Sequence, residues 1–203
     1  MRAPLDEMIA VFRESLTQMS KKLDSLLIAA YAVDQADRFE TVANIQAAIE
    51  QDTVVMEAQV IDVLATQQPV LATDLSMAKG LLIALRQLGH IAREQRDLAE
   101  LMDRLGINDP QLPLDARALL PEIRQVILES TAAFLNDDRV LAEFTFERID
   151  RLERVLRATP TPEHPPTMVP VAQLHLFALG RILDAARDIT RSAPLYRYVN
   201  VPA

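Results

Sequence analysis

The sequence predicts an all-α protein made of two sequence-related, antiparallel three-helix bundles. The composition is rich in Leu, Ala, Arg and Glu, with four glycines and 4% aromatic residues, which is typical of helical proteins. Apolar residues recur at steps of three and four over long stretches, which is the period of a helix. A segment near residue 89 also resembles one that lies 91 residues later, close to half of this 203-residue chain.

The internal repeat is clearest in two segments, Leu88–Leu98 and Leu179–Ile189. Both begin with the pattern L-G-x-I, and both end with Arg-Asp followed by Leu or Ile. Self-similarity at a fixed offset indicates a duplicated structural unit. We therefore expect a single all-α domain of two repeats, with one three-helix bundle over residues 1–106 and a second over residues 107–203.

The first half predicts three helices. Apolar residues keep strict 4-3 spacing from about residue 5 to residue 30, and the short polar residues at 34–37 suit a turn. A second helix should cover about 42–63. Gln67-Gln68-Pro69 should end it, because a proline disfavours helical geometry at the residue before it. The third should run to about Leu105, with Pro69 in its first turn and Gly106 as its C′ residue.

The second half predicts the same scheme. A helix from about Asp115 should carry Pro121 in its first turns or at a kink, and Asn136–Asp138 should form the turn that follows. The apolar residues expected to face inward from the fifth helix are Leu141, Phe144, Ile149, Leu152 and Leu156. Residues 159–170 contain five prolines and predict an extended connector, after which a sixth helix runs from about Met168 to Arg191.

Composition excludes several classes of function. The net charge is −8 without any basic block, which argues against binding to nucleic acid. The absence of cysteine rules out disulfides and thiolate metal sites. No stretch approaches 18 consecutive apolar residues, and the acidic amphipathic start is unlike a signal peptide. We expect a soluble, cytoplasmic protein without membrane insertion.

The sequence offers no recognisable catalytic machinery. Its three histidines, His90, His164 and His175, have no second histidine at helical metal-ligand spacing and no Glu-x-x-His partner. No glycine-rich phosphate loop or nucleophile elbow occurs either. We therefore expect each histidine to be structural or solvated, and we predict no catalytic residue, no cofactor-binding residue and no enzymatic activity.

Within this organisation the sequence resembles the PhoU family of phosphate-uptake regulators. The third helix of that family's repeat begins with a QP motif followed by DL, which here is Gln68-Pro69 followed by Asp74-Leu75. At the place of the family's E-R-I-G-D segment this chain has Gly89–Arg93 in the first repeat and Gly180–Asp184 in the second. The resemblance covers nearly the whole chain, including the order of the helices.

The resemblance implies metal sites whose ligands are only partly present. Carboxylates four residues apart share a helix face and can hold a cation together. In the first repeat, glycine replaces the first acid and Arg93 replaces the second. We expect this metal site to be absent, with Arg93 pairing instead with Glu50 of the second helix.

The second repeat keeps three candidate metal ligands, Asp150, Asp184 and Asp188. The first acid of the family's segment is absent, because Gly180 stands in its place. These aspartates imply a partial site that would hold a divalent or trivalent ion weakly. The alternative is that Asp184 and Asp188 are solvated charges, with Arg181 and Arg187 as partners at helical spacing.

Gly89 and Gly180 need a separate reason, because a mid-helix glycine costs about 1 kcal/mol relative to alanine. One explanation is that something other than the protein itself approaches the helix closely at these positions. The other is close packing between helices, and this is the explanation that we expect.

The family resemblance also implies a function. It predicts a homodimeric cytoplasmic adaptor that contacts the ATPase of a phosphate ABC transporter and a sensor histidine kinase, and so acts as a negative regulator of phosphate-starvation signalling. The first alternative is a related adaptor of a different transporter or signalling system, with metal binding lost. The second is a metal-dependent helical enzyme, which would need a cluster of acids and histidines that the sequence does not assemble.

Overall fold

The computed structural model describes residues 3–33, 37–66, 72–110, 112–159 and 171–193, and these residues form an all-α fold. The helices are α1 (Ala3–Ala30), α2 (Arg38–Thr66), α3 (Ala72–Arg104), α4 (Leu114–Asn136), α5 (Arg139–Ala158) and α6 (Val171–Arg191). No strand occurs in the described ranges. The prediction of an all-α protein with six helices is thus confirmed. Within the same ranges, no helix has both the length and the apolar character needed to cross a bilayer.

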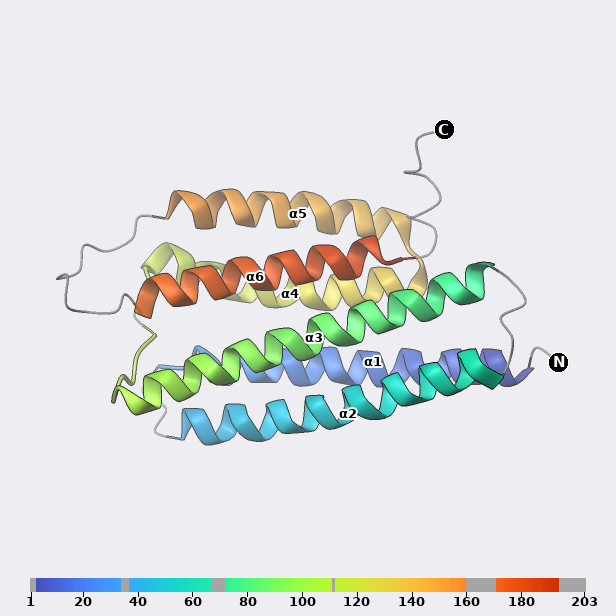
Figure 1. The fold of residues 1–203 in the computed structure, drawn as a ribbon. Helices are drawn as coiled ribbons and strands as arrows, with labels where there is room; N and C mark the ends of the chain where they lie inside the picture. Colours follow the sequence, from blue (N-terminus) through green and yellow to red (C-terminus); the bar gives the residue numbers. More distant parts are fainter. Residues whose placement is uncertain (1–2, 34–36, 67–71, 111, 160–170, 194–203) are drawn as a thin grey trace.

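The helices form two groups of three that lie side by side (Figure 1). Helices α1, α2 and α3 contact one another, and α4, α5 and α6 do the same. The two groups meet where α1 contacts α4 and α3 contacts α6, whereas α2 and α5 lie on the two outer sides. The division into repeats at residues 106 and 107, and the duplication behind it, stay predictions.

One hydrophobic core runs through both groups. The strict 4-3 spacing of α1 buries Leu16, Met19, Leu23 and Leu26 completely, and these side chains belong to the same cluster as residues of α6 such as Leu183. Burying each such side chain contributes about 1.5–3 kcal/mol. Because the core is shared, the two halves pack against each other along their length and are not joined by the linker alone.

Two of the predicted turns are confirmed in detail. Gly106 adopts a left-handed conformation with φ of 65°, and the amides of Gly106 and Ile107 donate to the carbonyls of Asp103 and Met102, a Schellman arrangement that ends α3. At the second turn, Asp137 is left-handed and Asp138 caps α5 by accepting a hydrogen bond from the Leu141 amide at 3.0 Å.

Some packing predictions are wrong. Phe144 was expected in the core, but it is half exposed, with the Arg148 guanidinium 4.9 Å from its ring centre. Ala142 and Thr145 are buried on α5 in its place. Pro121 lies inside α4, consistent with the prediction. The expectations for Pro69, His164 and the proline-rich connector fall outside the described residues.

Ion pairs and hydrogen bonds reinforce the contact between the two groups. Arg124 of α4 donates two hydrogen bonds to the Asp24 carboxylate of α1, at 2.6 and 2.9 Å. The Gln87 amide of α3 donates to Asp188 of α6 at 2.9 Å. The paired hydrogen bonds of Arg124 fix the position of α4 along α1, because a planar guanidinium fits a carboxylate in one orientation.

A buried polar cluster lies near the end of this contact. The side chain of His175 is only 2% exposed, with its Nε2 3.2 Å from the Met102 sulfur and its ring edge-on to Tyr31 at 5.3 Å. The pKa of His175 falls to about 4, chiefly because burial penalises the charged ring and also because the Arg38 guanidinium is near, while Asp109 opposes the shift. His175 is therefore a neutral core residue, as expected for a structural histidine.

A close contact between the two groups occurs at Gly80 of α3. A Cβ atom at this position would lie 2.6 Å from the Phe134 ring of α4 and 2.8 Å from the Ser192 carbonyl oxygen. No side chain fits at such distances without a shift of the backbone. Gly80 therefore lets α3 lie directly against the completely buried Phe134.

We predict that Gly80→Ala destabilises the protein even though alanine favours helices. The gain of about 1 kcal/mol in helix propensity should be outweighed by about 1–3 kcal/mol of overpacking against Phe134 and the Ser192 carbonyl. Gly180→Ala is the matched control, because a Cβ there meets nothing within 4 Å, and it should stabilise the protein. Urea unfolding of both variants measures the difference, and equal effects would contradict the assigned role of Gly80.

We also predict a loss of stability in acid that depends on His175. The unfolded chain takes up a proton near pH 6.5, but the folded chain does so only near pH 4, so the free energy of unfolding should fall as the pH drops between these values. At about 1.4 kcal/mol per pKa unit the loss is about 3 kcal/mol. Urea unfolding of wild type and His175→Gln from pH 7 to 4 isolates this contribution. Equal pH slopes for the two proteins would refute it.

Candidate functional site

The two mid-helix glycines of the repeat do not serve close helix packing. At Gly180 a Cβ atom would meet nothing within 4 Å, and at Gly89 it would meet only Thr53, at an ordinary 3.5 Å. The expectation that both glycines allow helices to touch is therefore wrong, and the glycine with this role is Gly80. Each of the two instead leaves bare helix backbone in the wall of a surface pocket.

The first pocket, of about 250 Å³, lies between α2 and α3. Its lining residues are Glu50, Thr53, Val54, Glu57, Arg86, Gly89, His90 and Arg93. Apart from Val54 and Gly89, these are polar or ionisable, and the acids come from α2 whereas the arginines come from α3. The pairing of Glu50 with Arg93 was predicted from the sequence, but the pair of Glu57 with Arg86 beside it was not.

The arginines of this pocket face the acids in matching register. Arg93 lies 3.8 Å from Glu50, as predicted, and Arg86 lies 3.2 Å from Glu57. The amide of Gln46 also donates to Glu50 at 2.8 Å. Both ion pairs are largely exposed to solvent, so each contributes at most about 1 kcal/mol. Glu50 and Glu57 are seven residues apart, and so are Arg86 and Arg93. This shared spacing is the sequence signal that could have predicted both ion pairs.

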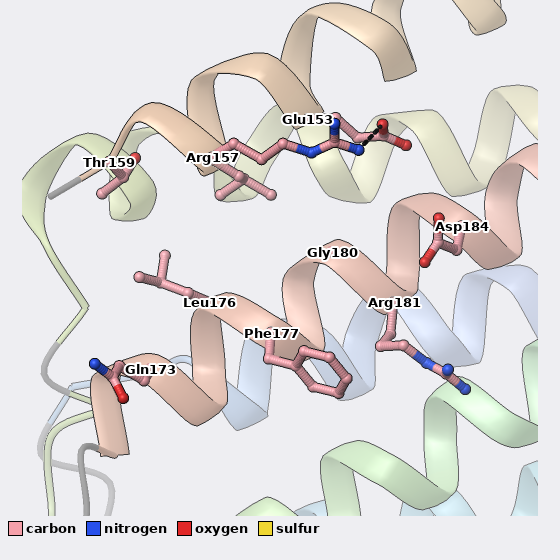
Figure 2. A pocket seen from close by; sticks show the side chains of 10 residues that line it. Glu153, Arg157, Thr159, Gln173, Leu176, Phe177, Gly180, Arg181 and Asp184 are labelled. Carbon is pink, nitrogen blue, oxygen red and sulfur yellow. Dashed lines mark hydrogen bonds and ion pairs between the residues drawn. The ribbon is translucent and has the colours of Figure 1, made fainter. Parts of the chain in front are cut away.

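The second pocket, of about 400 Å³, lies between α5 and α6 around Gly180. Its lining residues are Glu153, Leu156, Arg157, Thr159, Gln173, Leu176, Phe177, Gly180, Arg181 and Asp184. Figure 2 shows Arg157 and Glu153 paired on α5, with Phe177, Arg181 and Asp184 projecting from α6 on either side of the bare glycine. Phe177 is two-thirds exposed. This pocket is more apolar than the first and has both charge signs at its rim.

The three candidate metal ligands of the second half have separate surroundings. Asp150 of α5 accepts a hydrogen bond from Arg187 at 2.7 Å, Asp188 accepts one from Gln87 of α3, and Asp184 lines the second pocket. In the part of the chain that the structure describes, no three His, Asp or Glu side chains gather into a group that could hold a metal ion. These residues do not fit a metal centre as they stand, and the partial site stays a prediction.

The alternative partners expected for Asp184 and Asp188 are also not the ones observed. Arg187 is held by Asp150 and by Glu153 at 2.8 Å, and Arg181 turns toward α3. The guanidinium of Arg181 lies 2.6 Å from the His90 Nε2 and 3.4 Å from Glu94. The same His90 nitrogen lies 3.1 Å from Glu94 Oε1, so Glu94 lies against both Arg181 and His90.

This contact joins the two pockets, because His90 lines the first and Arg181 lines the second. The two residues also occupy matching places, each directly after the glycine of its L-G-x-I segment. The candidate site is therefore a pair of hollows linked across the meeting line of α3 and α6. In the first hollow, Arg93 pairs with Glu50 at a position where the family resemblance would place a metal-binding carboxylate.

We predict that metal binding can be built back into the first pocket. Gly89→Glu with Arg93→Asp would put two carboxylates on one face of α3, opposite Glu50 and Glu57, and such a set of oxygen ligands suits a divalent cation. Metal analysis after incubation with Mn²⁺ and dialysis should find the ion in this variant and only substoichiometric metal in wild type.

The control for that experiment is Gly89→Gln with Arg93→Asn, which has nearly the same shape but no added charge. It should not retain the ion. Stoichiometric metal in the wild-type protein would contradict the view that Arg93 has replaced a ligand.

Comparisons with known proteins identify the fold. A solved structure, the crystal structure of PhoU from Pseudomonas aeruginosa, matches 98% of this chain and 97% of its own, with a TM-score of 0.61 and 18% sequence identity. No family model matches the sequence, and no curated protein matches it. At this identity the likeness shows the fold alone, and the chain has a PhoU-like fold.

Proposed function

We propose that this chain is a non-enzymatic, cytoplasmic regulator of phosphate uptake and of phosphate-starvation signalling. It would act through contacts with the ATPase of a phosphate ABC transporter and with a sensor histidine kinase, and it would form a homodimer. The observation that carries the proposal is the likeness to PhoU over almost the full length of both chains. Gln68-Pro69 and Asp74-Leu75 also support it, because this part of the sequence resembles the start of the third helix of the PhoU family's repeat.

The described surface supports binding more than catalysis. The buried histidine contacts a methionine sulfur, and the ionisable side chains in the two pockets are largely arginines and carboxylates engaged with each other. Proton transfer needs an acid or base whose pKa suits the working pH, whereas a docking scaffold needs long, rigid helices. The six packed helices provide such a scaffold.

A second candidate function is an adaptor of a different transporter or signalling system. The Glu50–Arg93 pair favours it, because a chain that has exchanged a carboxylate for an arginine at this place has changed the chemistry of the pocket. Both candidates keep the same scaffold and differ only in the partner.

We predict that deleting the gene in the source organism switches on a phosphate-starvation reporter in phosphate-rich medium, and that the wild-type gene restores repression. An adaptor that damps the response would produce this result, since its loss leaves the kinase unrestrained. Purified tagged chain should also retain the phosphate-transporter ATPase from membrane extract. A silent reporter, with a different transporter ATPase retained, would reject the phosphate function in favour of the second candidate.

A further inference from the structure

The solvent-facing side of α2 carries a largely apolar seam. Its members follow alternating steps of four and three and are all exposed: Ala47, Gln51, Val54, Ala58, Ile61 and Ala65. Val54 is 62% exposed and Ile61 59%, and the adjacent Val55 is 49% exposed. The outer face of a surface helix is normally polar, and this spacing is that of a coiled-coil seam. We call these six residues the α2 seam.

The α2 seam is distinct from the face of α2 that packs inside the protein. Val42, Ile49, Met56 and Val60 are buried apolar members of that inner face. Helix α2 is therefore apolar on two sides, although only one of them is covered by α1 and α3 (Figure 1).

The corresponding outer helix of the other half has a different surface. The exposed residues of α5 are mostly charged and include Arg139, Glu143, Glu147, Asp150, Arg151, Arg154 and Arg157. Some form pairs one turn apart, such as Arg139 with Glu143 at 2.9 Å. Val140 and Phe144 are exposed near the start of α5, but Glu147 and Arg151 follow them at the next steps of the helix. A largely apolar seam without charged members therefore distinguishes α2 from α5.

The shape of the α2 seam suits a second helix. It covers residues 47–65, or roughly 28 Å at 1.5 Å per residue. The small side chains of its three alanines allow another helix backbone to approach closely. Val54 and Ile61 project from the seam as larger apolar side chains. Knobs inserted between the side chains of a facing helix are the basis of coiled-coil pairing.

The charges beside the α2 seam indicate what kind of helix it would accept. Glu50, Glu57 and Asp62 flank it, and residues 39–66 contain no Lys or Arg. The arginines that contact Glu50 and Glu57 belong to α3, and an ionised carboxylate can accept further hydrogen bonds. Two copies of α2 face to face would bring acids against acids, whereas a helix flanked by Lys or Arg would meet opposite charge.

We propose that the α2 seam docks an amphipathic helix of a partner protein, and that basic residues flank the apolar stripe of this helix. The net charge of −8 would also speed the encounter with a basic partner. The inference concerns the surface used and the chemistry of the partner helix. It does not depend on which transporter or kinase the chain regulates, so the two proposals can fail separately.

The test uses the full chain and two fluorescent helical peptides, each as long as the seam and with the same Leu stripe, one flanked by Lys and the other by Glu. Fluorescence anisotropy at physiological salt should show binding of the Lys-flanked peptide and at least about tenfold weaker binding of the Glu-flanked one, a ratio that corresponds to about 1.4 kcal/mol. Val54→Asp, which buries a charge in the interface, should weaken the Lys-flanked peptide by about tenfold or more.

The matched control is Val140→Asp on α5, where the valine is 78% exposed. It adds the same negative charge and should leave binding unchanged. A general attraction of the basic peptide to an acidic protein would instead strengthen binding for both variants, which would overturn the proposal. Absence of binding, or equal binding of the two peptides, would do the same. Sedimentation that shows a dimer lost in Val54→Asp would assign the seam to a second copy of the chain and also overturn it.

Discussion

At Gly80 of α3, the Phe134 ring of α4 and the Ser192 carbonyl that follows α6 leave no room for a side chain between the two halves. Without a side chain at this point, the Phe134 ring lies directly against the helix backbone, and α1 and α3 can run along α4 and α6 as one packed layer. The hydrogen bonds of Arg124 with Asp24 then fix the two halves along their axes. Because the inner helices bury each other, α2 and α5 are left as the two outer faces available to partners.

The two outer helices, α2 and α5, differ in the chemistry of their exposed surfaces. Helix α5 is solvated by its charges, and its acids are held by arginines of its own half, as Asp150 is held by Arg187. In helix α2, Glu57 and Glu50 contact Arg86 and Arg93 of α3, and apolar residues face outward. In both halves, arginine–carboxylate pairs surround the bare helix backbone at Gly89 and Gly180. In the described part of the chain, the candidate site is therefore a pair of hollows lined by ion-paired side chains.

Much of the fold follows from local patterns in the sequence. The 4-3 spacing of α1 predicts its buried face, and Gly106 and Asn136–Asp138 predict two helix ends, because left-handed and capping conformations depend on one or two residues. Phe144 could not be placed in this way. It satisfies the apolar period of α5 equally well, and only the position of the neighbouring helices leaves it half exposed.

The glycines show the same limit for the candidate site. The sequence marks Gly80, Gly89 and Gly180 alike, as residues that weaken a helix, and the repeat drew attention to the wrong two for close packing. Which glycine faces a neighbouring ring and which faces a pocket depends on contacts between residues far apart in the chain, such as Gly80 with Phe134. The Glu50–Arg93 pair was predictable because two family positions already faced each other, whereas the contact of His90 with Arg181 needed the packing of the two halves.

We propose that this PhoU-like chain regulates by docking a partner protein on the α2 seam. Amide hydrogen exchange of the full chain, with and without the purified phosphate-transporter ATPase or the cytoplasmic part of the sensor kinase, tests it most directly. The account predicts slower exchange across residues 47–65 of α2 in the presence of one of these partners, with α5 unchanged. Exchange that both partners leave unchanged along the whole chain, or slow only on α5, would contradict it.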